Sequence, residues 1–453
     1  MISRLSVARM TLASLLLLGT GCSSGPDAAA IAQLDSAAPL HEAMHELTST
    51  MVYDIVSPPQ ASRTYSYASI AAYEALRHQD TAWRSLAGQV GNMPGPPAPQ
   101  SGVTYSWSLA GVRAFLTVAR QLTFSRARMD SVRTAFDARW RDAGVPTDVW
   151  ERSIAYGDSV AAHVLRWAGT DGFKESRGMP KFSVTANPAR WVPTPPAYMD
   201  AVEPNWGTLR PFVMDSASQF RPAPAVPFDS TPGSAFHRHA REVYDTGRQL
   251  TEEQRAIASF WDCNPYVMNV QGHTAFATKK ITPGGHWMGI ATIVSRQQQS
   301  TLLETADTYA RTAMALADAF IAAWEEKFRS GVIRPETAIN AYIDERWTPL
   351  LQTPPFPEYP SGHSVISTSA AQVLTALYGD SLAFTDSTEV PFGLPTRRFT
   401  SFKAAAAEAA ISRLYGGIHF RPAIEEGQRQ GAEVGALLVA RVVTRPSDRV
   451  ATR

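Results

Sequence analysis

Three short segments in the last third of the chain place basic side chains and histidines at spacings that suit an oxyanion. The first contains Lys327, near the end of an expected helix that stops at about Gly331, and Arg334. Pro335 disfavours helical geometry at the residue before it, so Arg334 is expected in an extended turn. Trp324 lies three residues before Lys327 and shares its helix face. Lys327 is therefore expected at a helix end and Arg334 in the extended turn that follows it.

The second segment reads Tyr359-Pro360-Ser361-Gly362-His363 and stands directly before a helical run. Ser361 is placed as the N-cap of that helix. Helix N-termini present free N–H groups and a partial positive charge, which favours an oxyanion. Gly362 allows close approach of the backbone, and His363 in the first turn can exchange a proton beside the anion.

The third segment runs from Ser412 to His419. An alanine-rich helix delivers Arg413, two glycines at 416 and 417 break it, and His419 enters from the next stretch of chain. Each of these residues alone has an ordinary structural explanation, because single arginines are usually solvated and single histidines are usually structural. Their combination predicts one oxyanion pocket lined by cations.

The order of these motifs resembles the superfamily of type 2 phosphatidic acid phosphatases, bacterial acid phosphatases and vanadium haloperoxidases. The resemblance covers residues 327–419, and the flanking runs at 347–359 and 415–420 are similar to the bacterial haloperoxidase branch. It implies an enzyme of the peroxidase class with orthovanadate as cofactor, which oxidises halide with hydrogen peroxide to hypohalous acid. It does not identify an organic acceptor.

The resemblance also assigns the oxyanion-binding residues. Three side chains would neutralise vanadate oxygens: Lys327, Arg334 and Arg413. The vanadate would also contact the Ser361 hydroxyl, the Gly362 N–H group and the His363 imidazole. His419 would bind the metal through a ring nitrogen. The two catalytic residues are then His419 and His363, the latter as the acid–base group for peroxide.

Further residues near the motifs are candidates for supporting roles. Trp324 and Phe356 match positions that flank the halide in such enzymes. Asp262 and Tyr266 are second-shell candidates, with Asp262 as a possible partner of Arg413. His273 and His286 are additional candidates for the same shell, and each has a purely structural alternative.

One position departs from the family pattern. The pattern has Asp four residues after the last histidine, where it orients the ring, and this chain has Ala423. A backbone carbonyl, Glu425 or Glu426 could replace that Asp.

Two other function classes compete with the peroxidase. In a phosphomonoesterase of the acid phosphatase or phosphatidic acid phosphatase type, His419 would form a phosphohistidine and His363 would protonate the leaving group. A non-enzymatic surface lipoprotein could also keep the fold. The positions of Trp324 and Phe356 and the lack of expected membrane helices favour the peroxidase, and the presence of all motif residues disfavours a non-enzymatic role.

The elements that must position these residues are mainly helical. The expected fold is mainly α, with two helix bundles of the haloperoxidase/acid phosphatase type and an irregular Pro-rich excursion. The expected divisions are an N-terminal helical half (36–185), a Pro-rich segment (186–234) and a C-terminal helical half with the oxyanion site (235–445). Helical periodicity is expected over 41–56, 66–77, 103–122, 125–142, 149–167, 302–329, 361–378, 402–414 and 424–442, with a capping box at 251–254.

The composition and the N-terminal sequence limit the partners and the cellular location that can be expected. The formal net charge of +1 over 453 residues argues against nucleic acid as a partner. Residues 1–21 resemble a signal peptide, and residues 22–35 a lipoprotein tether that starts at Cys22. Ser23 favours sorting to the outer membrane, facing the periplasm or the cell surface. The expected protein is exported and touches a membrane only through this lipid anchor.

Overall fold

The computed structural model describes residues 28–445 and 447–448, so the expected signal peptide and the first six residues of the expected tether (22–27) lie outside the described residues. Residues 28–34 of that tether form a helix. The N-terminal helices are α1 (Ala28–Leu34), α2 (Ala38–Tyr53), α3 (Pro58–Leu76), α4 (Trp107–Leu122), α5 (Arg126–Asp142), α6 (Thr147–Ala168) and α7 (Phe173–Ser176), with the 3₁₀ helix η1 (Arg77–Gln79). The C-terminal helices are α8 (Ala235–Arg248), α9 (Glu252–Phe260), α10 (Pro283–Gln297), α11 (Leu302–Ser330), α12 (Pro335–Tyr342), α13 (Gly362–Tyr378), α14 (Phe402–Tyr415) and α15 (Arg421–Arg441). The mainly helical prediction is confirmed.

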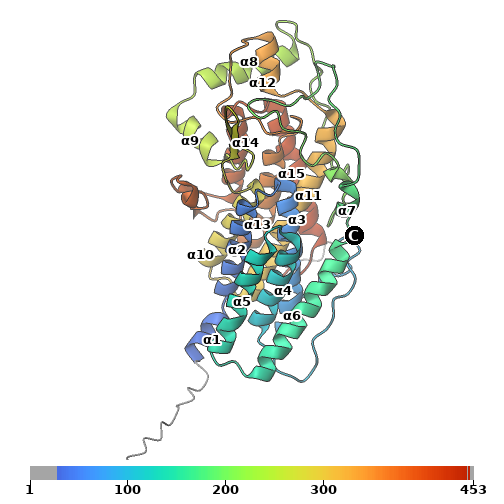
Figure 1. Cartoon of the computed structure of the whole chain (residues 1–453), viewed down its shortest axis with the longest axis vertical. Coiled ribbons are helices and arrows are strands. Elements are labelled where there is room, and N and C mark those ends of the chain that lie inside the picture. The colour runs from blue at the N-terminus through green and yellow to red at the C-terminus, as the bar shows by residue number, and fades with distance from the viewer. Residues whose placement is uncertain (1–27, 446, 449–453) are drawn as a thin grey trace, which may run out of the picture.

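Helix α11 joins two groups of helices. It packs on α3, which packs on α4 and α6, and α4 also packs on α5. It packs as well on α13 and α15, and α13 contacts both α14 and α15. Figure 1 shows α4, α5 and α6 at one end of the elongated molecule and α8, α9 and α12 at the other. A capping box at Thr301 and Glu304 begins α11, and Gly331 in the left-handed region (φ 58°) ends it. Nearly all of α11 is buried, so one helix carries the core of both groups.

Strands are few in the described part of the chain. They form two antiparallel hairpins, β1 (Met268–Gln271) with β2 (Thr274–Ala277), and β3 (Phe384–Asp386) with β4 (Arg397–Phe399). The second hairpin encloses the short helix η3 (Val390–Phe392).

Several helices were missed by the sequence periodicity because prolines and glycines stand at their starts. Helix α3 begins eight residues before its expected start, at Pro58, with Ser57 as its N-cap. Helices α10 and α12 likewise begin with a proline at the first turn, where a missing N–H costs nothing. Helix α8 buries one stripe, made of Phe236, Ala240, Val243 and Tyr244, and its other residues are mostly polar. The predicted capping box at Thr251 and Gln254 is present at the start of α9.

The Pro-rich stretch at 186–234 is irregular, as expected, and is packed on the helices. It contains only the 3₁₀ helix η2 (Trp206–Thr208). Its Trp191, Trp206 and Phe212 side chains are buried. The backbone N–H groups of Phe212, Val213 and Met214 donate to the buried Asp318 carboxylate of α11, at 2.6, 2.8 and 3.2 Å. This carboxylate therefore fixes the segment to the central helix.

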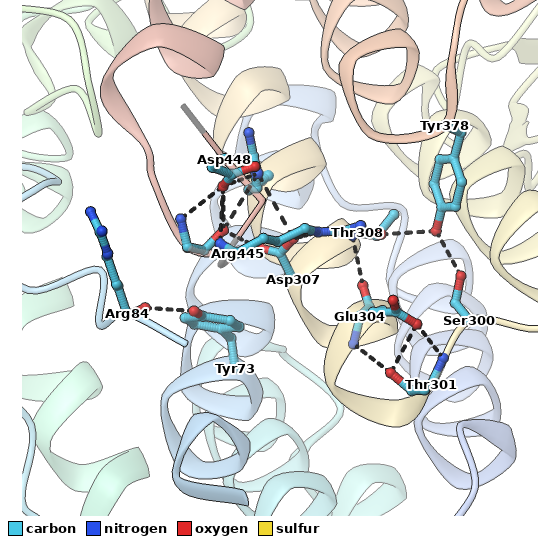
Figure 2. A network of polar contacts seen from close by, with 12 residues as sticks. Tyr73, Arg84, Ser300, Thr301, Glu304, Asp307, Thr308, Tyr378, Arg445 and Asp448 are labelled. Atoms are coloured by element: carbon cyan, nitrogen blue, oxygen red, sulfur yellow. Dashed lines mark hydrogen bonds and ion pairs between the residues drawn. The ribbon is translucent and has the colours of Figure 1, made fainter. Parts of the chain in front are cut away.

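The chain after α15 is fixed to the same helix by a second polar network (Figure 2). The buried Asp307 carboxylate of α11 accepts from the Thr444 hydroxyl at 2.6 Å and from Nε of Arg445 at 2.6 Å. Arg311 Nη1 donates to Asp448 at 2.9 Å. The end of the chain is thus tied to the first half of α11.

Within the described residues, no helix combines the length and the apolar character needed to cross a bilayer.

Replacing Asp318 tests whether the Pro-rich segment depends on this one anchor. Asp318→Ala leaves three buried N–H groups without an acceptor, so we expect the free energy of unfolding to fall by at least about 3 kcal/mol. Asp318→Asn keeps one acceptor oxygen, so its free energy of unfolding should lie between those of the wild type and of Asp318→Ala. Urea unfolding measures the loss. Asp215→Ala removes an exposed pair with Arg441 and should cost less than about 1 kcal/mol; equal losses for both sites would contradict the anchor.

Candidate active site

Three buried cations converge from three helix ends. Lys327 lies in the last turn of α11, Arg334 is the N-cap of α12, and Arg413 lies in the last turn of α14. Their exposed fractions are 0%, 0% and 1%. Arg334 has extended geometry (φ −79°, ψ 152°), as the Pro335 argument predicted. The structure therefore brings together cations that the sequence separates by up to 86 positions.

Backbone carbonyls orient Lys327. Its Nζ donates to the carbonyl oxygens of Pro357, Glu358 and Pro360 at 2.9, 3.0 and 2.5 Å. The ammonium group thus holds the turn before α13 in place, and its charge remains inside the pocket.

Carbonyls also orient the two arginines, but leave donors free. Arg334 Nε donates to Phe356 O and its Nη1 to Ile418 O, both at 2.8 Å. Arg413 Nη1 donates to Trp261 O at 2.8 Å. Arg334 Nη2 and Arg413 Nε are buried and have no hydrogen-bond partner among the described residues. Buried donors of this kind call for a ligand.

No carboxylate in the described part of the chain forms an ion pair with any of these three cations. Burial lowers the pKa of Lys327 well below its ordinary value, and lowers the pKa of Arg334 to about 9. The charges of Glu358, on Lys327 and Arg334, and of Asp262, on Arg413, oppose this lowering without forming an ion pair. Burying a charge without an ion-pair partner costs several kcal/mol. The pocket is therefore built to hold an anion, and the free arginine donors fit the oxygens of a tetrahedral oxyanion.

The start of α13 supplies the cradle. Ser361 caps the helix, accepting from Ser364 N at 3.3 Å and from the Ser364 hydroxyl at 2.9 Å. Both contacts use the Ser361 oxygen as acceptor, which leaves its own O–H to donate. A Cβ at Gly362 would lie 3.4 Å from the Trp324 ring and 3.6 Å from Lys327 Cε. A side chain at Gly362 would thus occupy the space beside the cations.

His363 faces this cradle with a free ring nitrogen. Its ring hydrogen-bonds the carbonyl of Trp261, and its Nε2 is buried without a partner. Burial, followed by the charge of Arg413, lowers the pKa of His363 well below its ordinary value. The imidazole is therefore neutral near pH 7 and can accept a proton.

His419 is held by a carboxylate that the sequence analysis missed. Glu358 Oε1 lies 2.9 Å from His419 Nδ1 and accepts from Phe420 N at 2.9 Å. A carboxylate beside Nδ1 favours the proton on that nitrogen, so the lone pair lies on Nε2. His419 Nε2 is 3.2 Å from Arg334 Nη1, inside the pocket. Burial, then nearby Arg334 and Lys327, lowers the pKa of His419 well below its ordinary value.

Glu358 therefore takes the role that Asp has in the family pattern. None of the three expected substitutes does so: Nδ1 contacts Glu358 and no backbone carbonyl of the described chain, Glu425 is exposed, and Glu426 accepts from Ala223 N and Arg429. Ala423 and Glu358 line the same small cavity. The signal for Glu358 was its acidic side chain within an otherwise apolar Pro-Phe-Pro-Glu-Tyr-Pro run.

The expected halide-flanking residues meet at one wall of the pocket. The Trp324 and Phe356 rings are 4.8 Å apart, and Phe356 also lies 5.2 Å from Lys327 Nζ. Both rings line one cavity together with His363, Arg413 and His419. Tyr266, a second-shell candidate, lines the same cavity.

The other candidates lie elsewhere. The Asp262 carboxylate pairs with Lys280 at 2.5 Å and makes no hydrogen bond to Arg413. Burial lowers the pKa of the Arg413 guanidinium, and the charge of Asp262 opposes part of this lowering. His273 is exposed in the β1–β2 turn, and His286 is fully buried in a separate cluster.

Comparison with known proteins agrees with this geometry. A family model described as the VCPO second helical-bundle domain matches residues 307–447, which include all the motif residues. The chain is 46% identical to a solved bacterial vanadium-dependent iodoperoxidase, with a TM-score of 0.86 over 90% of this chain and 97% of that one. The curated proteins gave no match.

More distant structures share the fold. A holo-type bacterial vanadium-dependent chloroperoxidase is 19% identical, with a TM-score of 0.64 over 85% of this chain and 92% of that one. An apo-type bacterial chloroperoxidase is 18% identical, with a TM-score of 0.63 over 83% and 92%. On the 46% identity over nearly the full length, the chain belongs to the vanadium-dependent haloperoxidase family.

Removing Glu358 tests its support of His419. Because second-shell partners typically contribute 10–100-fold to metal affinity, we expect Glu358→Ala to weaken vanadate binding by about that factor, and Glu358→Gln by less. Equilibrium dialysis of the purified chain with vanadate measures the affinity without relying on turnover.

A rescue variant shows whether any loss of affinity comes from the orientation of the His419 ring or from misfolding. Ala423→Asp placed in the Glu358→Ala background offers the acceptor from the family position and should recover part of the affinity. Glu74→Gln is the matched control, since its buried carboxylate pairs with Arg77 and not with His419, and its vanadate affinity should be unchanged. Unchanged vanadate affinity in folded Glu358→Ala would show that His419 does not depend on this carboxylate.

Proposed function

We propose that this protein binds orthovanadate in the pocket and oxidises halide with hydrogen peroxide to hypohalous acid. The observation that carries the proposal is a set of three buried cations without carboxylate partners around a neutral histidine. Family membership narrows the anion from oxyanions in general to vanadate.

The residues present fit that cofactor. Arg334 Nη2 and Arg413 Nε are free to donate to its oxygens, as are the Ser361 hydroxyl and the Gly362 N–H, while Lys327 adds charge. His419 Nε2 would be the metal ligand. Bound vanadate supplies a Lewis acid that activates hydrogen peroxide without changing its own oxidation state.

His363 is the group that moves a proton. Its Nε2 is unpartnered and neutral near pH 7, so it can take a proton from incoming hydrogen peroxide and return it later in the cycle. The Trp261 carbonyl holds the ring in orientation, because it is itself fixed by Arg413.

We propose iodide as the preferred halide. The 46% identical relative is an iodoperoxidase. The Trp324–Phe356 wall gives a polarisable, weakly hydrated anion an aromatic surface close to the Lys327 charge. Strongly hydrated chloride would gain less from such a wall because it loses more hydration on entry.

A phosphatase reading of the same pocket is not favoured by these relatives, and a direct assay separates the two. Purified protein loaded with vanadate should oxidise iodide with hydrogen peroxide faster than bromide or chloride. The vanadate-free protein should turn over a phosphate ester slowly or not at all. Ester hydrolysis that needs His419, with no oxidation of any halide, would overturn the proposal.

Substitutions of the two histidines should separate their roles. His363→Ala should lower kcat for iodide oxidation by about 10²–10⁴-fold, the usual contribution of general acid–base catalysis, while vanadate still binds. His419→Ala should abolish both oxidation and tight vanadate binding. The exposed His273→Ala is the control and should behave as wild type. Iodide oxidation that survives His419→Ala would remove His419 as the metal ligand.

We infer from the N-terminal sequence that the mature protein is exported and anchored by lipid at Cys22. The full chain expressed in a two-membrane bacterium should then fractionate with the outer membrane, and Cys22→Ser should release it or leave it unprocessed. Metabolic labelling with a fatty acid detects the lipid. A soluble, unlabelled wild-type protein would contradict the anchor.

A further inference from the structure

A second polar cluster lies beside the oxyanion pocket and is not used by the proposed reaction. It joins Cys263, which follows α9, with His286 of α10 and Glu389 just before η3. The three side chains are buried, with 1%, 0% and 2% exposure. Three separate segments therefore deliver a thiol, an imidazole and a carboxylate to one buried point.

The ligand atoms of this cluster face one another. Cys263 Sγ is 3.3 Å from His286 Nδ1 and 3.5 Å from Glu389 Oε1, and His286 Nδ1 is 3.0 Å from Glu389 Oε1. Zinc bonds of about 2.3 Å to sulfur and about 2.1 Å to nitrogen or oxygen place tetrahedral ligand atoms roughly 3.4–3.6 Å apart. An ion therefore needs these atoms to separate by only a few tenths of an ångström.

A fourth residue supports the arrangement from behind. Asp386 Oδ2 lies 2.7 Å from His286 Nε2, and Asp386 accepts from Thr388 N at 2.9 Å. Metal-binding histidines usually give their remote N–H to a carboxylate in this way, which fixes the tautomer and leaves the near nitrogen for the metal. This contact points His286 Nδ1 at the thiol and at Glu389.

The charges in the cluster also accommodate a dication. No lysine or arginine in the described residues forms an ion pair with Asp386 or Glu389, so His286 is their only cationic partner. A bound dication would be balanced by the Cys263 thiolate, which metal binding deprotonates, and by the Glu389 carboxylate.

We propose that Cys263, His286 and Glu389 form a binding site for a divalent transition-metal ion of the zinc type, distinct from the vanadate site. The thiolate and imidazole ligands select zinc over magnesium or calcium, which prefer oxygen ligands. Three protein ligands leave a fourth position for solvent or another small ligand.

The site supports the oxyanion pocket through one tryptophan. The Trp261 ring stacks on His286 with centroids 4.5 Å apart and an interplanar angle of 20°. The Trp261 carbonyl accepts from Arg413 and from the His363 ring. An ion at Cys263 and His286 therefore fixes the turn that orients two residues of the active site.

Metal binding is tested on the full-length chain carrying Cys22→Ser, so that Cys263 is the only thiol. After chelator treatment and addition of Zn²⁺, we expect one ion per chain to survive desalting. Co²⁺ should give thiolate-to-cobalt charge-transfer absorption. If the Cys22→Ser chain is folded and retains no ion, the proposal is overturned.

Variants locate the ion. Cys263→Ser should abolish the charge-transfer band, and Glu389→Gln and Asp386→Asn should each weaken binding about 10-fold or more. His419→Ala should keep both the ion and the band, because the vanadate site is separate. A band that persists in Cys263→Ser, or that disappears in His419→Ala, would overturn the assignment.

Discussion

The burial of three positive charges without carboxylate partners is the constraint on which the rest of the structure depends. Carboxylates paired with Lys327, Arg334 and Arg413 would make the pocket more stable without a ligand and useless for an anion. The chain instead orients these groups with backbone carbonyls, which are dipoles and do not cancel the charge. The carbonyls therefore orient the three cations, and their charge is left to be neutralised by a bound anion.

Helix ends are the means by which the fold meets this constraint. Lys327 and Arg413 lie in last turns, where the helix dipole favours cations, and Gly362 opens a helix whose N-terminus favours an anion. The cations thus lie where helices tolerate them, and the anion lies where a helix attracts it. The central position of α11 makes this convergence possible, because both helix groups pack against it.

The sequence predicted the parts of the site whose geometry is local. Ser361 as an N-cap, Gly331 as a helix end and Arg334 in an extended turn each depend on residues within a few positions, and the structure has all three. The acidic side chain of Glu358 stood out in an apolar run, but its pairing with His419 was missed, because it lies 61 positions away and no local pattern gave its direction. The cluster of Cys263, His286 and Glu389 joins three segments whose contact no local pattern encodes. Helices α3, α10 and α12 were shortened or missed for the opposite reason, since a proline at a first turn looks like a break in periodicity.

The position of Glu358 shows what the chemistry constrains and what it leaves free. As the proposed metal ligand, His419 needs an acceptor at Nδ1, and nothing in that requirement specifies the segment that supplies the acceptor. In this chain the acceptor comes from the turn before α13, whose carbonyls hold Lys327 and whose next residues are the Ser361–His363 cradle. His419 is therefore hydrogen-bonded to the same short segment that contains Ser361, Gly362 and His363. A displacement of this segment moves the cradle, the lysine and the histidine together, so their mutual distances depend on one turn of the chain.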